Sequence, residues 1–205
     1  MVSQVLDVQV AGRRVQAVLD ASESSAKGLA VVAHPHPLYG GTMDNKVVQT
    51  LSRAFVRSGW HCLRFNFRGV GGSEGVHDDG IGETQDLLNL VDQVAPDGPL
   101  ALAGFSFGAF VACQALHDLW PTGRVQKTIL VGTAVPKFPA TALPLDAHEQ
   151  ALVIHGEEDD TVALSGVLDW ARPQLLPVTV IPAGGHFFHG QLTLLKSLAM
   201  RHLRA

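Results

Sequence analysis

The sequence carries little charge and contains no run of basic residues. Lys and Arg number 15 and Asp and Glu 19 among 205 residues, a formal net charge of −4. Basic side chains occur no more than two in a row, at Arg13 and Arg14. A protein that grips phosphate backbones or anionic lipid needs concentrated positive charge. We therefore expect neither a nucleic-acid nor a membrane partner.

The sequence also lacks a membrane span, a disulfide framework and a nucleotide-binding fingerprint. Its most apolar stretch, residues 98–113, is short and interrupted by glycine and proline. The first residues lack the basic and apolar regions of a signal peptide, so we expect a cytoplasmic protein. Cys62 and Cys113 lie in apolar segments and are expected to be buried reduced thiols. No P-loop is present, and Glu74 replaces the third glycine of a dinucleotide fingerprint, so no cofactor is expected.

Hydrophobic residues are abundant, at 46%, and they occur in short segments. Residues 2–10 and 13–20 alternate apolar and polar side chains across a tight turn, which predicts an antiparallel hairpin. Six nearly continuous apolar runs follow, as expected for strands buried on both faces. They cover residues 28–33, 60–67, 100–105, 128–131, 151–155 and 178–181.

Helical stripes of apolar residues separate these runs. One opens at Asp44 and stops at Gly59, others cover 87–94 and 192–203, and residues 107–119 are expected to be helical. Alternating strands and helices predict one α/β domain over residues 1–205. We expect a mostly parallel eight-stranded sheet with an N-terminal antiparallel hairpin and helices on both faces. A site is then expected at the carboxyl ends of the strands.

The pattern Gly-x-Ser-x-Gly occurs twice, around Ser106 and around Ser73. A nucleophile elbow needs a strand that ends just before the serine and a helix that begins just after it, because the sharp turn lifts the hydroxyl above the sheet. Ser106 meets both conditions, whereas Ser73 lies in a glycine-rich loop. We expect Ser106 to be the nucleophile.

A serine hydroxyl needs a base to take its proton, commonly a histidine oriented by a carboxylate. In elbow hydrolases the acid and then the histidine follow the serine in the chain. Four carboxylates come directly after the run 151–155; Asp159 is the predicted acid, with Asp160 and Glu158 as alternatives. His186 follows the last strand and its turn and is the predicted base, with His189 as the alternative.

The segment after the run 28–33 is expected to supply one hydrogen-bond donor for an oxyanion. Pro35 and Pro37 have no N–H, so the donor must be His36, Leu38 or a later residue. The N–H of Phe107, at the start of a helix, is the expected second donor. The pair of histidines at 34 and 36 has no second ligand cluster nearby, so no metal site is expected.

These segments together resemble a known family. HPHPLYGGTMDNKVV, RFNFRGVGGSEG, GFSFGA, HGEEDDTV and GGHFFHGQL are similar to small, lidless bacterial serine hydrolases of the α/β-hydrolase superfamily, related to dienelactone hydrolases and short-chain carboxylesterases. The resemblance implies that Ser106, Asp159 and His186 form a catalytic triad. It also favours His36 as a donor, because relatives carry His-Gly-X at this place. Dienelactone hydrolases use a cysteine nucleophile, where this chain has Ser106.

We therefore expect a serine esterase that cleaves small soluble carboxylic esters through an acyl-enzyme. Pro136, Pro139 and Pro144 interrupt residues 132–150, which leaves no room for the helical lid of lipid-cleaving relatives. The open site is expected to be lined by Leu38, Tyr39, Val135 and Phe187. A thioesterase or an amide or peptide hydrolase would use the same residues. A non-catalytic binding module and a C–C bond lyase on this fold are the alternatives from other classes.

Overall fold

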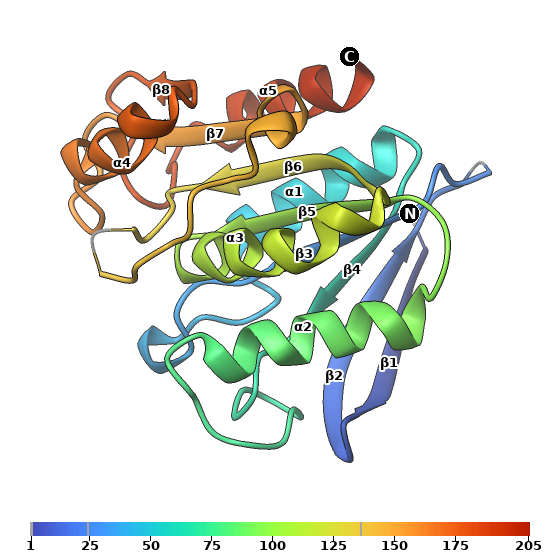
Figure 1. The fold of residues 1–205 in the computed structure, drawn as a ribbon. Helices are drawn as coiled ribbons and strands as arrows, with labels where there is room; N and C mark the ends of the chain where they lie inside the picture. The colour runs from blue at the N-terminus through green and yellow to red at the C-terminus, as the bar shows by residue number, and fades with distance from the viewer. Residues whose placement is uncertain (1, 24, 136) are drawn as a thin grey trace.

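The computed structural model describes residues 2–23, 25–135 and 137–205. Within these ranges, eight strands form one sheet in the order β1-β2-β4-β3-β5-β6-β7-β8 (Figure 1). The strands are β1 (Val2–Val10), β2 (Arg13–Ala21), β3 (Leu29–Ala33), β4 (His61–Phe65), β5 (Leu100–Phe105), β6 (Val125–Val131), β7 (Ala151–Gly156) and β8 (Val178–Ile181). The helices are α1 (Lys46–Arg57), α2 (Ile81–Val94), α3 (Phe107–Leu119), α4 (Leu164–Ala171) and α5 (Leu192–Arg204).

The direction of the strands follows their polarity pattern. β1 and β2 pair antiparallel along their whole length, and Ala11 and Gly12 make the turn with φ of 48° and 78°. β1 lies at the sheet edge, and most of its side chains are exposed. β2 pairs antiparallel with β4, whereas all pairs from β4 to β8 are parallel. The predicted mostly parallel sheet with an antiparallel hairpin is confirmed.

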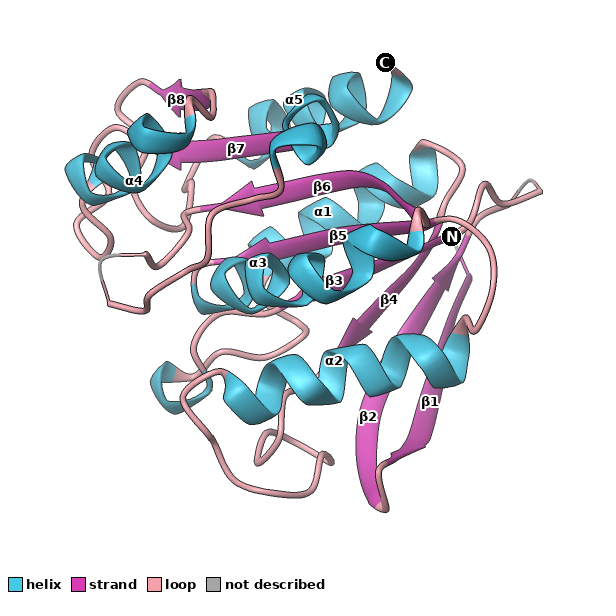
Figure 2. Cartoon of the chain, in the orientation of Figure 1, coloured by secondary structure: helices cyan, strands magenta, loops and turns pink. Residues whose placement is uncertain are grey.

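Two apolar layers cover the two faces of the sheet. One packs α1 and α5 against it through side chains such as Leu51, Phe55 and Leu195. The other packs α2 and α3 against it and includes Leu87 and Val111. Every residue of β3 and β5 is buried between these layers, which explains why both strands are continuous apolar runs. Figure 2 shows the helices on either side of the strands.

The structure corrects the predicted start of α1. Asn45, and not Asp44, caps this helix: its side-chain oxygen accepts the N–H of Val47 at 2.9 Å. Asp44 instead accepts a hydrogen bond from Nη1 of Arg64 at 3.1 Å. Both residue types are good caps, but the nearby guanidinium provides a charged partner that favours the carboxylate over the amide.

Two strand boundaries also differ from the prediction by two residues or more. β6 begins at Val125 rather than at residue 128, and β4 ends at Phe65 rather than at residue 67. The second difference has a visible cause, because the N–H of Phe67 donates to the ring of His34 at 3.0 Å instead of to a strand. The chain therefore leaves the sheet here and enters a loop.

The connection between β6 and β7 holds no helical lid. Its described residues are loop except for a short 3-10 helix, Leu145–Gln150. Pro139 and Pro144 lie in the loop, and Pro136 falls outside the described residues. The sheet edge above the nucleophile strand is consequently not covered by inserted helices.

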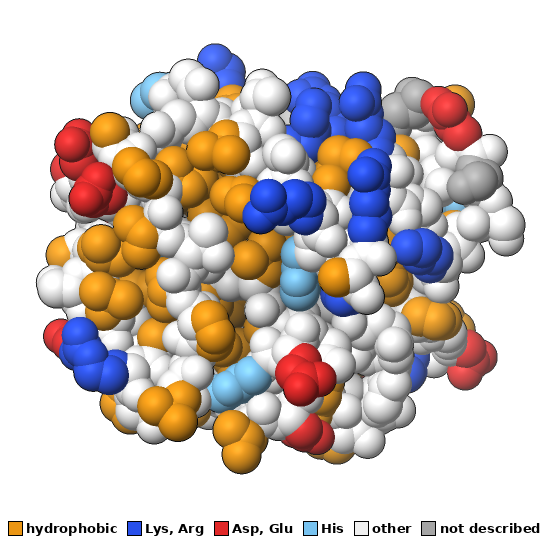
Figure 3. Space-filling view, turned by 90° about the horizontal axis from the view of Figure 1, so that it is seen from above, with side chains coloured by type: hydrophobic (Ala, Val, Ile, Leu, Met, Phe, Trp, Pro, Cys, Tyr) orange, Lys and Arg blue, Asp and Glu red, His pale blue; other side chains and the backbone are white. Residues whose placement is uncertain are grey.

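The face that looks onto the β8 edge separates apolar from basic side chains. Hydrophobic side chains gather over α4 and β8, whereas Lys and Arg gather toward α5 (Figure 3). Leu175, Val180 and Leu194 are large exposed hydrophobic residues in this part of the chain. No helix among the described residues is both long and apolar enough to cross a membrane.

Candidate active site

Ser106 lies at the sharp turn between β5 and α3. Its backbone has φ 57° and ψ −117°, a combination that residues other than glycine rarely adopt. The N–H of Ser106 donates to the carbonyl of Val131 on β6 at 2.8 Å, and its carbonyl accepts the N–H of Ala109 at 3.0 Å. These bonds hold the strained turn from both sides.

The two glycines that flank Ser106 permit this turn by their size. A Cβ at Gly104 would overlap the carbonyl oxygen of Gly108, and a Cβ at Gly108 would overlap the carbonyl oxygen of Ala33 on β3. Strand and helix therefore approach more closely than any side chain allows. The predicted strand-turn-helix context of Ser106 is present in the structure.

Ser106, His186 and Asp159 form a continuous hydrogen-bonded chain. Nε2 of His186 lies 3.0 Å from Oγ of Ser106, and Nδ1 of His186 lies 2.7 Å from Oδ2 of Asp159. The three residues come from the ends of β5, β7 and β8, so the parallel sheet brings together positions up to 80 apart in sequence. All three are buried, with exposed fractions of 7%, 4% and 8%.

Asp159 is fixed by backbone donors as well as by histidine. Its Oδ1 accepts the N–H of Thr161 at 3.0 Å and that of Val162 at 2.7 Å. Burial raises the pKa of Asp159, but the hydrogen bonds from His186 and from these two N–H groups outweigh it, so the pKa lies below its ordinary value. The carboxylate is therefore held in its charged form.

The alternative acids and bases point elsewhere. Asp160 accepts from the hydroxyl of Thr161 at 3.1 Å, and Glu158 is exposed, with no ion pair to a described residue. Exposed His189 has its ring 5.9 Å from that of Phe187, centre to centre. Ser73 is buried in its loop. The hydrogen-bonded chain thus contains the predicted residues and none of the alternatives.

Sequence reasoning missed His155, the buried residue near the end of β7. Its Nε2 lies 2.9 Å from the carbonyl of Val162 and 3.5 Å from Oδ2 of Asp159. Burial lowers the pKa of His155 below its ordinary value. The neutral ring braces the turn that carries the carboxylate. Its position directly before the acidic segment was the available signal, since the side chain of a strand's last residues often faces the site.

In residues 35–41, the segment after β3, the N–H of His36 has no acceptor among the described residues. The N–H of Leu38 donates to Nδ1 of His36 at 3.2 Å. The N–H groups of Tyr39, Gly40 and Gly41 donate to carbonyls within the same segment. Among the described residues no acceptor is bonded to the N–H of His36, nor to that of Phe107 at the start of α3. These two are the donors that the sequence favoured.

His34 holds this segment in place. The N–H of Phe67 donates to Nε2 of His34 at 3.0 Å, which leaves Nδ1 to donate to the carbonyl of Pro35 at 2.6 Å. Burial lowers the pKa of His34 to about 4. The neutral ring therefore bridges the loop after β4 and the segment that carries His36.

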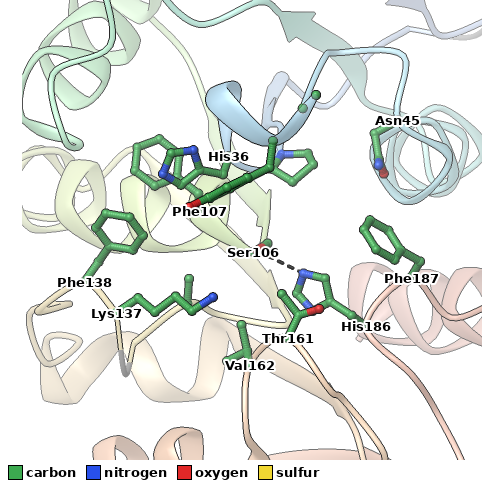
Figure 4. A pocket seen from close by; sticks show the side chains of 15 residues that line it. His36, Asn45, Ser106, Phe107, Lys137, Phe138, Thr161, Val162, His186 and Phe187 are labelled. Atoms are coloured by element: carbon green, nitrogen blue, oxygen red, sulfur yellow. Dashed lines mark hydrogen bonds between the residues drawn. The ribbon is translucent and has the colours of Figure 1, made fainter.

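A pocket of about 340 Å³ opens beside Ser106. Figure 4 shows the side chains that surround it. Tyr39 and Phe187, both predicted, are in the lining, but Leu38 and Val135 are not. Leu38 projects into solvent with 70% of its surface exposed, and Val135 packs against the apolar core. The residues of the lining are Pro35, His36, Tyr39, Gly40, Gly41, Asn45, Ser106, Phe107, Ala134, Lys137, Phe138, Thr161, Val162, His186 and Phe187.

Most of the unpredicted lining comes from three loops. Asn45 belongs to the segment before α1, Lys137 and Phe138 to the connection after β6, and Thr161 and Val162 to the loop after β7. All follow carboxyl ends of strands, which was the general signal. Within the described residues no group of three or more His, Cys, Asp or Glu side chains is arranged to hold a metal ion.

The sequence matches the family model for the alpha/beta hydrolase fold over residues 38–148, which is more than half of this chain. The chain belongs to the α/β-hydrolase family. This hydrolase is similar to a solved α/β serine hydrolase without a lid from Xanthomonas campestris, with 33% identity and a TM-score of 0.88 over 98% of this chain and 94% of that one. It is also similar to an α/β serine hydrolase homologue from Coxiella burnetii, with 33% identity and a TM-score of 0.84 over 99% and 98% of the chains.

A curated relative matches a shorter part of this hydrolase. An uncharacterized protein from Rickettsia prowazekii is 48% identical over 90 residues, which is 42% of this chain and 38% of the relative. The aligned part thus spans well under half of that relative's length. The predicted superfamily and the predicted lidless fold are confirmed by the family match and the two solved structures.

Proposed function

We propose that this α/β hydrolase is a serine esterase that cleaves small soluble carboxylic esters through an acyl-enzyme. The observation that carries the proposal is the chain from Asp159 through His186 to Ser106, which ends beside a pocket. A serine whose hydroxyl lies within hydrogen-bonding distance of a histidine nitrogen, itself oriented by a carboxylate, is the arrangement that activates a hydroxyl as a nucleophile.

The first half-reaction forms the acyl-enzyme. Oγ of Ser106 attacks the ester carbonyl carbon while Nε2 of His186 accepts the hydroxyl proton. Asp159 keeps Nδ1 of His186 protonated and stabilises the positive charge that the ring acquires. The bond between the carbonyl carbon and the alcohol oxygen then breaks, and His186 returns the proton to the leaving alkoxide.

The second half-reaction releases the acid. Water attacks the carbonyl carbon of the acyl-enzyme as His186 takes one of its protons. The bond to Oγ breaks, and the proton passes to Ser106, which restores the hydroxyl. In both halves the carbonyl oxygen becomes negative, and the N–H groups of His36 and Phe107 are the proposed donors to it.

The pocket favours short acyl groups. Its walls include Phe107, Phe138 and Val162, and no inserted α-helix among the described residues covers it. Each methylene group gains about 0.8 kcal/mol only while it is buried. We therefore expect the highest kcat/KM for acyl chains of about two to six carbons, without activation when the substrate forms an emulsion.

Labelling and turnover together test the proposal. A fluorophosphonate should label the wild-type protein at Ser106, and a series of nitrophenyl esters of rising chain length should show the short-chain optimum. Thioesters and amides of the same acids serve as parallel arms. Faster cleavage of thioesters or amides would replace the ester assignment. A protein that is not labelled would contradict Ser106 as the nucleophile.

We also propose that the protein acts in the cytoplasm. Both cysteines, Cys62 and Cys113, are free and buried, which is typical of proteins in a reducing compartment.

A further inference from the structure

The described lining of the pocket contains one Lys or Arg side chain. This is Lys137, in the connection after β6, and the lining contains no Asp or Glu. Figure 4 shows the side chain of Lys137 extending between Phe138 and Val162, with its nitrogen end toward the pocket. The other walls are mainly aromatic and aliphatic. Lys137 itself is exposed, so its positive charge lies where solvent and a bound substrate can both reach it.

Lys137 has no carboxylate partner among the described residues. Arg64, Arg68 and Arg172, by contrast, each pair with an aspartate at 2.7–2.8 Å. A positive charge without a protein partner next to a reaction centre has a simple use, because a substrate can supply the missing anion.

The two acidic groups that act on His36 are already engaged. Burial lowers the pKa of His36, and the charges of His77 and Lys137 lower it further. The carboxylates of Asp79 and Glu83 act in the opposite direction and raise this pKa. Glu83 accepts from the ring of His77 at 2.8 Å and from two backbone N–H groups. Asp79 lies 3.3 Å from the other ring nitrogen of His77. The carboxylates of Asp79 and Glu83 thus already interact with His77. The charge of Lys137 acts on His36 across the pocket.

The position of Lys137 indicates which part of a substrate it meets. His186 must protonate the leaving alcohol, so the alcohol lies on the side of His186 and Phe187. Figure 4 places Lys137 and Phe138 on the other side of Ser106. The acyl part of an ester bound in this way would extend in that direction.

We propose that Lys137 selects esters whose acyl group ends in a carboxylate, such as monoesters of short dicarboxylic acids. The inference rests on the proposed esterase function and narrows its substrate class. The apolar walls hold the methylene chain, and the ammonium of Lys137 pairs with the distal carboxylate. Lys137 is then a specificity residue that takes no part in bond breaking.

Matched substrates measure this preference. Monomethyl esters of succinic, glutaric and adipic acid are compared with the same esters whose free carboxylate is replaced by a primary amide, and methanol release is followed. For the best chain length, kcat/KM for the carboxylate should exceed that for the amide by about tenfold, equal to about 1.4 kcal/mol. High salt should reduce the ratio.

Variants assign the preference to Lys137. Lys137→Met should bring the ratio to about one by lowering kcat/KM for the carboxylate substrate only. Lys137→Glu should invert the ratio, and Lys137→Arg should retain most of it. Lys196→Met, on α5 and outside the lining, is the matched control and should match wild type. An unchanged ratio in Lys137→Met overturns the inference, as does a preference for acetyl esters of charged alcohols over monoesters of diacids.

A binding measurement separates this inference from the esterase proposal. Calorimetry with Ser106→Ala and monomethyl glutarate needs no turnover. Binding that is about tenfold weaker in Ser106→Ala/Lys137→Met supports the role of Lys137 even if no ester is cleaved. Equal binding to the two proteins overturns it even if Ser106-dependent cleavage of neutral esters is rapid.

Discussion

Two segments of this chain share the pattern Gly-x-Ser-x-Gly, and both serines are buried, yet their hydroxyl groups have different partners. Oγ of Ser106 faces the ring of His186 and a pocket. Oγ of Ser73 donates to the carbonyl of Asn66 at 2.7 Å and accepts the N–H of Gln16 at 3.0 Å. Its hydrogen-bonding capacity is therefore used by the backbone. A serine becomes a nucleophile through what surrounds its hydroxyl, and the five-residue pattern alone does not specify that.

The glycines of the two segments also serve different purposes. Gly104 and Gly108 are required by close packing of strand and helix. Gly71 and Gly75 have φ of +54° and +99°, so they are required by the path of a loop. One pattern thus arises from two unrelated constraints.

The largest expected difference between the segments is in activity. Ser106→Ala should lower kcat by about 10³- to 10⁶-fold, because the nucleophile is lost while the fold remains. Hydrolysis of a short-chain nitrophenyl ester by the purified variants measures this. Ser73→Ala is the control and should keep near wild-type kcat. The reverse pattern would mean that the wrong serine has been assigned.

The second difference is in tolerance of a methyl group. Gly104→Ala should lower the free energy of unfolding by more than about 3 kcal/mol, because its Cβ meets the backbone of Gly108. Gly75→Ala should cost about 1–2 kcal/mol, since its main penalty is the positive φ. Urea denaturation of both variants gives the comparison. Equal losses would show that the elbow relaxes as easily as the loop.

His34 links the loop after β4 to the segment that carries His36, and this buried histidine should make the free energy of unfolding depend on pH. The pKa of His34 falls from 6.5 to about 4 on folding, so the unfolded chain binds the proton first as the pH falls. Stability is complete above pH 6.5 and declines toward pH 4, by about 3 kcal/mol at roughly 1.4 kcal/mol per pH unit. The pKa values of buried His155 and half-buried His202 are lowered too, and both shifts act in the same direction.

Urea denaturation between pH 7 and pH 4.5 checks this dependence. His34→Gln, which keeps an acceptor for the N–H of Phe67, should show a shallower decline than wild type. His117→Gln changes an exposed histidine on α3 and serves as the control. Identical slopes for all three proteins would remove His34 as the source.

An effect smaller than that of Gly104→Ala concerns the hydroxyl of Ser73. Ser73→Ala leaves the carbonyl of Asn66 and the N–H of Gln16 without this buried partner, which should lower the free energy of unfolding by about 1–3 kcal/mol. Thermal denaturation measures the loss. No change in stability would indicate that the loop repacks around the missing oxygen.

The sequence predicted the sheet and the hydrogen-bonded chain because both depend on local patterns. Buried parallel strands appear as apolar runs, and residues just after such runs meet at one edge of the sheet. Ser106, Asp159 and His186 each occupy such a position, and the structure brings them together. Their catalytic roles, and the single domain over 1–205, stay predictions.

The pocket lining was harder to predict, for a physical reason. Whether a loop side chain faces a cavity depends on contacts made across the fold. Leu38 follows the same strand as Tyr39, yet only Tyr39 reaches the pocket. Asp44 and Asn45 are both good helix caps, and the distant Arg64 decides between them. No periodicity in the sequence encodes such choices.

The tight joint at Gly104 and Gly108 has a consequence for local opening. Ser106 projects from the packed interior of the protein, where β5 is fully buried between two apolar layers. A segment with these surroundings exchanges its amide hydrogens only when the whole core opens. The nucleophile should therefore keep its geometry up to the onset of global unfolding. Heating would then abolish reactivity and tertiary structure in a single step, and the fluorophosphonate-reactive fraction would report the folded fraction.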